Sequence, residues 1–121
     1  MIIKQLHSKQ EVAHFLDDII KGCKAIANKN TMNSAEHLLN MINWNIEQPN
    51  CYFLIGEHRD RCVGFLFALG IITDKSWCEI VALWTLPKLG SRMKYEGIDL
   101  LKKWCKDRDI STIMTNITRN L

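Results

Sequence analysis

Residues 77–117 read WCEIVALWTLPKLGSRMKYEGIDLLKKWCKDRDISTIMTNI and carry the clearest structural pattern in the chain. An apolar run typical of a strand comes first, and Pro87 ends it. Residues 93–107 then place apolar side chains on one helical face, and residues 110–117 read as another strand. A strand–helix–strand passage of this kind joins parallel strands. The passage predicts the parallel part of an α/β sheet, with any ligand near residues 83–97, beyond the carboxyl end of the first strand.

The residues before this unit predict helices and antiparallel strands. Ser8 and Glu11 form a capping box, so a helix begins there. Short polar connections at residues 57–60 and 73–75 imply an antiparallel meander. The expected elements are a strand at 1–6, a helix from 8 that breaks at 27–31, a helix from 33 or 34 that stops at 49–50, strands at 51–55, 62–69 and 77–86, a helix at 93–107 and a strand at 110–117.

This order, β-α-α-β-β-β-α-β, predicts one α/β domain over residues 1–121. Its mixed sheet should have four antiparallel strands and a last strand parallel to the fourth. The chain length of 121 residues, with 47% hydrophobic and 24% charged residues, is ordinary for a single globular domain.

Charge and hydropathy exclude several classes of protein. The net charge of +3 is not gathered into a stripe of Lys and Arg, so the sequence does not indicate nucleic acid binding. No apolar run approaches the roughly 18 residues of a membrane helix. The N-terminus lacks the features of a signal peptide. We therefore expect a cytoplasmic protein.

The metal-binding residue types show no ligand spacing. Five cysteines are irregularly placed and form no C-x-x-C pair, and the four histidines are scattered. We expect buried, reduced thiols and no metal site. The cysteines are Cys23, Cys51, Cys62, Cys78 and Cys105.

Two segments resemble the GNAT family of N-acetyltransferases. The run from Glu79 to Pro87 resembles the family's fourth strand, which often begins near an acidic residue and ends in a hydrophobic–x–Pro signature. The run RMKYEG at residues 92–97 resembles the family's coenzyme A motif, R/Q-x-x-G-x-G/A. Arg92 and Gly97 match that motif, whereas Tyr95 stands at the position of its first glycine and the connection from Pro87 is two residues longer. The resemblance covers this chain, but the family fold usually continues with another helix and two strands.

The resemblance implies acetyl-coenzyme A as co-substrate. The pyrophosphate of coenzyme A would lie on the free N–H groups at the start of the helix at 93–107. Residues 88–108 hold seven basic and three acidic side chains, which suits a polyanion. The positions that the resemblance assigns to cofactor binding are Leu83, Trp84, Leu86, Arg92, Met93, Lys94, Tyr95 and Gly97.

The resemblance also implies an acyl transfer to an amine of a small molecule or a protein. Glu79 is the candidate base, because it stands at the start of the fourth strand. The alternative is that Glu79 is an outward-facing strand carboxylate. The tyrosine that usually serves as the acid belongs to the later helix, and neither Tyr52 nor Tyr95 matches its position.

A second hypothesis is a catalytically inactive GNAT-like binding or inhibitory protein. Tyr95 and the missing later elements favour it, and compact forms of this kind are similar to phage-encoded proteins, which would act in the host cytoplasm. The strand at 110–117 would be an edge strand without Pro or Lys, and proteins usually cover such edges. We therefore expect a homodimer, or a protein partner, to cover residues 110–121.

Overall fold

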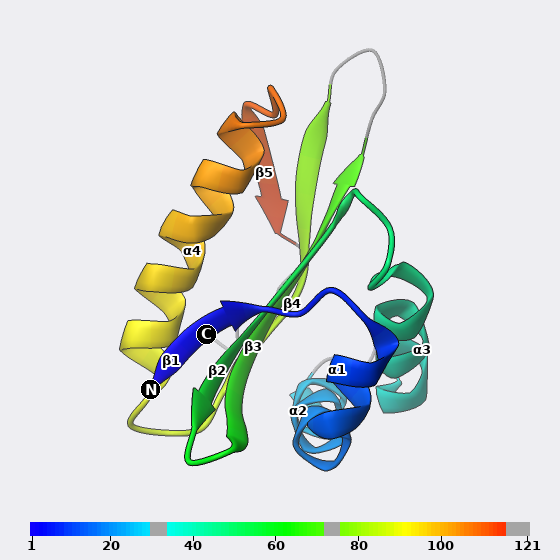
Figure 1. Cartoon of the computed structure of the whole chain (residues 1–121), viewed down its shortest axis with the longest axis vertical. Helices are drawn as coiled ribbons and strands as arrows, with labels where there is room; N and C mark the ends of the chain where they lie inside the picture. The colour runs from blue at the N-terminus through cyan, green and yellow to red at the C-terminus, as the bar shows by residue number, and fades with distance from the viewer. Residues whose placement is uncertain (30–33, 72–75, 116–121) are drawn as a thin grey trace.

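The computed structural model describes residues 1–29, 34–71 and 76–115. Their strands form one sheet with helices on both faces: α4 covers one face and α1 to α3 cover the other (Figure 1). The elements are β1 Ile2–Gln5, α1 Lys9–His14, α2 Leu16–Lys29, α3 Ala35–Asn45, β2 Cys51–His58, β3 Arg61–Ile71, β4 Trp77–Thr85, α4 Gly90–Lys106 and β5 Thr112–Thr115.

The sheet topology confirms the predicted mixed sheet. The strand order is β1-β2-β3-β4-β5, the first four strands are antiparallel neighbours, and β5 is parallel to β4. The expected turn at residues 57–60 is tighter than predicted: β2 runs to His58, and only Arg59 and Asp60 connect it to β3. Their φ angles of 53° and 60° are those of a two-residue hairpin turn that matches the strand twist. The expected turn at 73–75 lies outside the described residues.

The sequence predicted one continuous helix from residue 8, and this prediction is wrong. Its capping box is present, because the Ser8 side chain accepts from the Glu11 N–H and Glu11 accepts from the His7 N–H. However, Phe15 leaves the helical conformation at φ −109°, ψ 19° and buries its ring, so the chain forms α1 and then α2. α2 runs to Lys29, which falls inside the break expected at 27–31, and residues 30 and 31 lie outside the described residues.

The helix expected at 93–107 begins three residues earlier, so the prediction of a loop through Arg92 is wrong. Lys88, with φ 75°, turns the chain sharply after β4. The N–H of Met93 donates to the carbonyl of Leu89, which makes Leu89 the N-cap and Gly90 the first helical residue. At the other end of this unit, the described part of the last strand begins at Thr112, after a buried Ile110. Residues 116 and 117 of the predicted strand lie outside the described residues.

Two apolar layers flank the sheet. One lies between the sheet and α1 to α3, and the other lies between the sheet and α4. All five cysteines are buried and free, which confirms the predicted thiols. Burial raises the pKa of Cys23 to about 11 and that of Cys51 to about 12, so these thiols stay protonated and unreactive at neutral pH.

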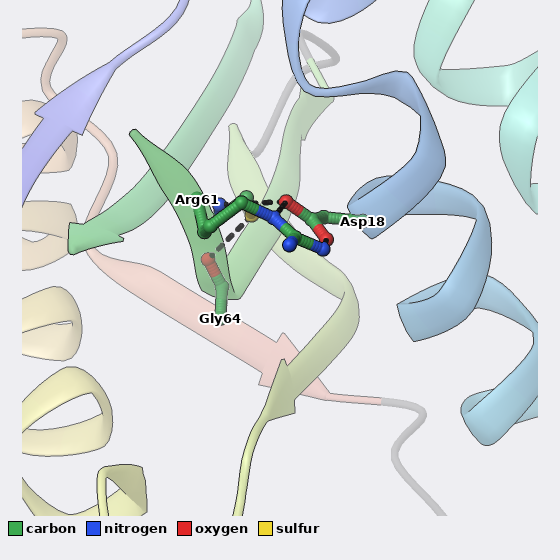
Figure 2. Close-up of polar contacts among 4 residues, drawn as sticks. Asp18, Arg61 and Gly64 are labelled. Atoms are coloured by element: carbon green, nitrogen blue, oxygen red, sulfur yellow. Dashed lines mark hydrogen bonds and ion pairs between the residues drawn. The ribbon is translucent and has the colours of Figure 1, made fainter. Parts of the chain in front are cut away.

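A buried carboxylate joins α2 to the start of β3 (Figure 2). Asp18 is 8% exposed and accepts from the Arg61 Nη2 at 2.6 Å, the Arg61 Nε at 3.0 Å and the Cys62 N–H at 3.0 Å. Asp18 therefore fixes α2 relative to the hairpin between β2 and β3.

Close approach of α2 to the sheet makes Gly22→Ala a destabilising change. A Cβ at Gly22 would lie 2.5 Å from ring carbons of Phe65 and Trp84, so the rings or the helix must move. We expect the free energy of unfolding to fall by about 1–2 kcal/mol, because overpacking outweighs the better helix propensity of alanine. The matched control is Gly97→Ala in α4, where the Cβ meets Leu66 at an ordinary 3.7 Å. That change should raise stability by up to about 1 kcal/mol. Chemical denaturation measures both, and a loss of stability in both variants would contradict the packing argument.

Candidate functional site

A cleft of about 390 Å³ opens where β4 ends and α4 begins. Leu83 and Thr85 of β4 form one side of it. The first two turns of α4 form the other side, with Gly90, Ser91, Lys94 and Tyr95. The cleft therefore lies beyond the carboxyl end of β4, where ligands bind in open α/β sheets.

The start of α4 has the chemistry of an anion site. The N–H groups of Gly90, Ser91 and Arg92 have no partner among the described residues, as expected for the first turn of a helix. The N-cap Leu89 supplies no side-chain hydrogen bond, and no acidic residue stands in the first turn. These N–H groups and the positive end of the helix dipole attract negative charge, and Lys94 adds a further positive charge to the cleft.

The edge of β4 extends this cleft toward the centre of the sheet. β5 pairs with β4 from Trp77 to Ile80, and on that side residues 81–85 of β4 pair with none of the described residues. A β-bulge lies at the boundary: Phe67 pairs with Ala82 and Ala68 pairs with Ile80, which leaves Val81 as the extra residue. A strand edge of this kind can pair with the amide groups of an extended ligand.

Of the residues that the sequence assigned to cofactor binding, three line the cleft. They are Leu83, Lys94 and Tyr95, and the Tyr95 ring is 69% exposed. Arg92 lies on the outer surface of α4, where its Nε is 3.1 Å from the Glu96 Oε1. This ion pair joins two half-exposed side chains one helical turn apart.

The other assigned residues lie away from the cleft lining. Met93 is fully buried between α4 and the sheet, and Gly97 is buried against Leu66. Gly97 also follows Gly90 by seven residues, which is roughly 10 Å along the helix. Trp84 is on the opposite face of β4, with its ring 5.6 Å from that of Phe65.

Leu86 lies just after β4 and faces a different hollow. Its N–H donates to the carbonyl of Val63. With Trp84 it lines a polar hollow under the β2–β3 hairpin, together with Asp18, Lys21 and Arg59.

Glu79 lies in the first half of β4 and is half-buried. It pairs with Leu69 of β3 and Met114 of β5. Leu69 packs in the layer under α1 to α3, and directly paired residues share a face, so Glu79 faces that layer rather than α4. Six residues separate Glu79 from Thr85, which corresponds to roughly 20 Å along the strand.

Sequence reasoning missed three residues that line the cleft: Thr85, Gly90 and Ser91. A Cβ at Gly90 would lie 2.8 Å from the Thr85 Oγ1, so a larger residue at this position would require the Thr85 side chain to move. The pair Gly90-Ser91 before an apolar helical face was the available signal, because a small polar residue often stands at a helix start.

Comparison with known proteins gives structural matches only. No model of a protein family matches the chain, and no curated protein matches it by sequence. A solved structure of a protein from Bacillus halodurans matches with a TM-score of 0.73 and 12% identity, over 98% of this chain and 83% of that one. An aminoglycoside 6′-acetyltransferase type Ii matches with a TM-score of 0.70 and 19% identity, over 95% of this chain and 70% of that one.

A third match is an acetyltransferase from Vibrio fischeri, with a TM-score of 0.68 and 12% identity over 98% of both chains. The chain has the fold of the GNAT acetyltransferases. Identity this low shows the fold alone. The matches give no support to the phage origin that the sequence suggested. Within the described part of this GNAT fold, no helix is long and apolar enough to cross a membrane.

Proposed function

We propose that the chain is an N-acetyltransferase that uses acetyl-coenzyme A to acetylate an amine. The cleft between the end of β4 and the start of α4 carries this proposal. It combines unpaired N–H groups at Gly90, Ser91 and Arg92, the positive charge of Lys94 and a strand edge at residues 81–85. A pyrophosphate attached to an extended amide-containing arm needs these three features together.

The residues of the cleft fit coenzyme A in spite of Tyr95. The Tyr95 ring is exposed at the side of the cleft, one turn after the N–H groups, so the backbone at the helix start stays accessible. Arg92 contributes positive charge at the rim if its guanidinium exchanges Glu96 for a phosphate oxygen. Met93 and Gly97 support the site from below by packing α4 against the sheet.

Acetyl-coenzyme A, when bound, supplies the acetyl group as a thioester. The bulge at Val81 lies between the cleft and Glu79 along β4, so a thioester held in the cleft would have Glu79 beyond this bulge. Glu79 is two residues from Val81, or about 7 Å along the strand, a separation that the length of its side chain and one water molecule can bridge together. In this proposal Glu79 would take the proton from the attacking amine, directly or through that water, and the coenzyme A thiolate that leaves the acetyl group would take its proton from solvent.

The acceptor is the least constrained part of the proposal. One structure with this fold is named an aminoglycoside acetyltransferase, so the fold accommodates amine acceptors. A small-molecule amine and a protein amine both remain candidates for this chain.

We further propose a homodimer, or a different protein partner, that covers residues 110–121, of which 116–121 lie outside the described residues. Light scattering after size-exclusion chromatography measures the mass of the chain in solution, and a mass of two chains would indicate the homodimer.

The test is calorimetric titration with acetyl-coenzyme A and coenzyme A, followed by an acetyl-transfer assay on a panel of amines. We expect both ligands to bind. Glu79→Gln should leave binding unchanged and lower turnover by about 100-fold or more, the range for loss of a general base. Failure of the unmutated chain to bind either ligand would remove the proposal.

The alternative is a GNAT-like protein that binds without catalysis. Tyr95 in place of a motif glycine and the Arg92–Glu96 ion pair favour it. Binding of coenzyme A with no transfer to any amine would support this alternative.

A further inference from the structure

A second pocket, of about 320 Å³, lies at the other end of the sheet from the cleft. It is formed where β3 ends, β4 begins and α4 finishes, at the top of the view in Figure 1. The length of α4, 17 residues or roughly 25 Å, separates it from the cleft. The lining residues are Pro49, Asn50, Gly70, Ser76, Trp104, Arg108 and Ile110.

Aromatic and aliphatic surfaces form most of this pocket. The ring of Trp104 stacks on that of Tyr52, with 5.1 Å between the centroids, so the indole is held in place. Gly70 keeps the space open, because a Cβ there would lie 3.4 Å from both Trp104 and Ile110. Because Tyr52 stacks on the indole and Arg108 lies over it, mainly the edge of the Trp104 ring borders the open space, and this fixed edge can pack against a flat apolar group.

The charge of the pocket is positive. The Arg108 guanidinium carbon lies 4.3 Å from the centre of the Trp104 ring, and its Nη1 donates to the Trp104 carbonyl at 3.3 Å. This arrangement orients the guanidinium and leaves further N–H groups available. None of the described residues that line the pocket is acidic.

Two side-chain N–H donors at this end of the molecule differ in how they are satisfied. The Asn50 Nδ2 donates to the Gly70 carbonyl at 3.0 Å. The buried Trp104 Nε1 has no acceptor among the described residues, an arrangement that is uncommon in proteins. The donors available to a ligand in the pocket are therefore those of the Arg108 guanidinium.

We propose that this pocket binds a small carboxylate with a flat apolar body, such as an aromatic acid. The body would lie against Trp104 and Ile110, and the carboxylate would accept paired hydrogen bonds from Arg108. The volume is at the lower end of the range for small-molecule sites, which limits the ligand to about one ring and a short chain. The site is independent of the proposed acetyl transfer.

The experiment is an NMR titration of the full chain, without coenzyme A, with benzoate and with its neutral analogue benzamide. Benzoate should shift the indole N–H signal of Trp104 and the backbone amide signals of Gly70 and Ile110. It should bind at least about 5-fold more tightly than benzamide, because a hydrogen-bonded carboxylate–guanidinium pair is stronger than a neutral contact. Arg108→Gln should reduce benzoate affinity to that of benzamide and leave benzamide unchanged.

Two further variants distinguish binding in the pocket from a general attraction between benzoate and the positive charges of the chain. Lys106→Gln removes an exposed charge from the same end of α4, outside the pocket lining, and should leave benzoate binding unchanged. Gly70→Ala narrows the pocket at ordinary contact distances and should weaken both ligands. Equal affinities for benzoate and benzamide, shifts that lie away from the pocket, or full binding by Gly70→Ala would each overturn the proposal.

Discussion

Ser91→Asp is expected to weaken coenzyme A binding by roughly 100-fold without loss of fold stability. The new carboxylate would stand in the first turn of α4, inside the cleft. Two unit charges 4 Å apart repel by about 4 kcal/mol at an effective dielectric constant of 20, and screening at an open cleft reduces this toward about 2.7 kcal/mol. The same carboxylate is favourable to the helix dipole by about 0.3–1 kcal/mol. Calorimetric titration and thermal unfolding measure the two effects separately.

The matched control is Ser91→Asn, which has nearly the same shape as the aspartate variant but no charge. Its affinity for coenzyme A should stay within about 3-fold of the unmutated chain, because a neutral amide repels no phosphate. Equal losses in the two variants would indicate a steric effect. Full binding by Ser91→Asp would mean that the phosphates lie elsewhere.

The parts of the fold that the sequence predicted are those where apolar periodicity decides the structure. The run ended by Pro87, the apolar helical face that follows it and the final strand were sufficient for the parallel β4–α4–β5 unit, which the structure confirms. The capping box at Ser8 was equally informative, because its hydrogen bonds are local. Phe15 interrupts the first helix for a tertiary reason, the burial of its ring, which no local pattern reveals.

The candidate site was harder to predict, because the coenzyme A motif fixes the spacing between residues but not the position at which the helix begins. Matching the coenzyme A motif placed its last glycine at Gly97, which lies well inside α4. The glycine that actually approaches β4 is Gly90, and it does so because Lys88 turns the chain at a positive φ. Lysine is uncommon in the left-handed backbone conformation, so the sequence offered little reason to expect the helix to begin at Gly90.

The bulge in β4 explains why Leu83 lines the cleft and Trp84 does not. Simple alternation from Ile80, which faces α4, would place Trp84 on the same face. The extra residue at Val81 reverses the alternation, so Leu83 packs toward α4 and Trp84 packs toward α2. A bulge depends on how two strands pair, which a single strand's sequence does not specify.

The ion pair between Asp18 and Arg61 gives the fold an acid-sensitive contact. The hydrogen bonds from Arg61 hold the pKa of Asp18 below its ordinary value. A lowered pKa in the folded state stabilises the fold above the pKa of the unfolded state, which is about 4, and this contribution is lost as the pH falls toward the folded-state pKa. The Arg61 side chain is 69% exposed, so solvent weakens the pair. The contact with the buried Cys62 N–H is not weakened in this way.

Asp18→Ala should therefore lower the free energy of unfolding by about 2–3 kcal/mol at pH 7, because it leaves the Cys62 N–H buried without an acceptor and removes two charged hydrogen bonds. Urea denaturation at pH 7 and at pH 3 measures the difference from the unmutated chain, which should shrink at the lower pH as Asp18 itself becomes protonated. The control is Asp17→Ala, which removes an exposed carboxylate from the same first turn of α2 and should lower stability by no more than about 1 kcal/mol, the range of its interaction with the helix dipole. A deficit for Asp18→Ala that is the same at both pH values would show that the charge on Asp18 does not stabilise the fold, and that its packing and its hydrogen bond from the Cys62 N–H account for the loss.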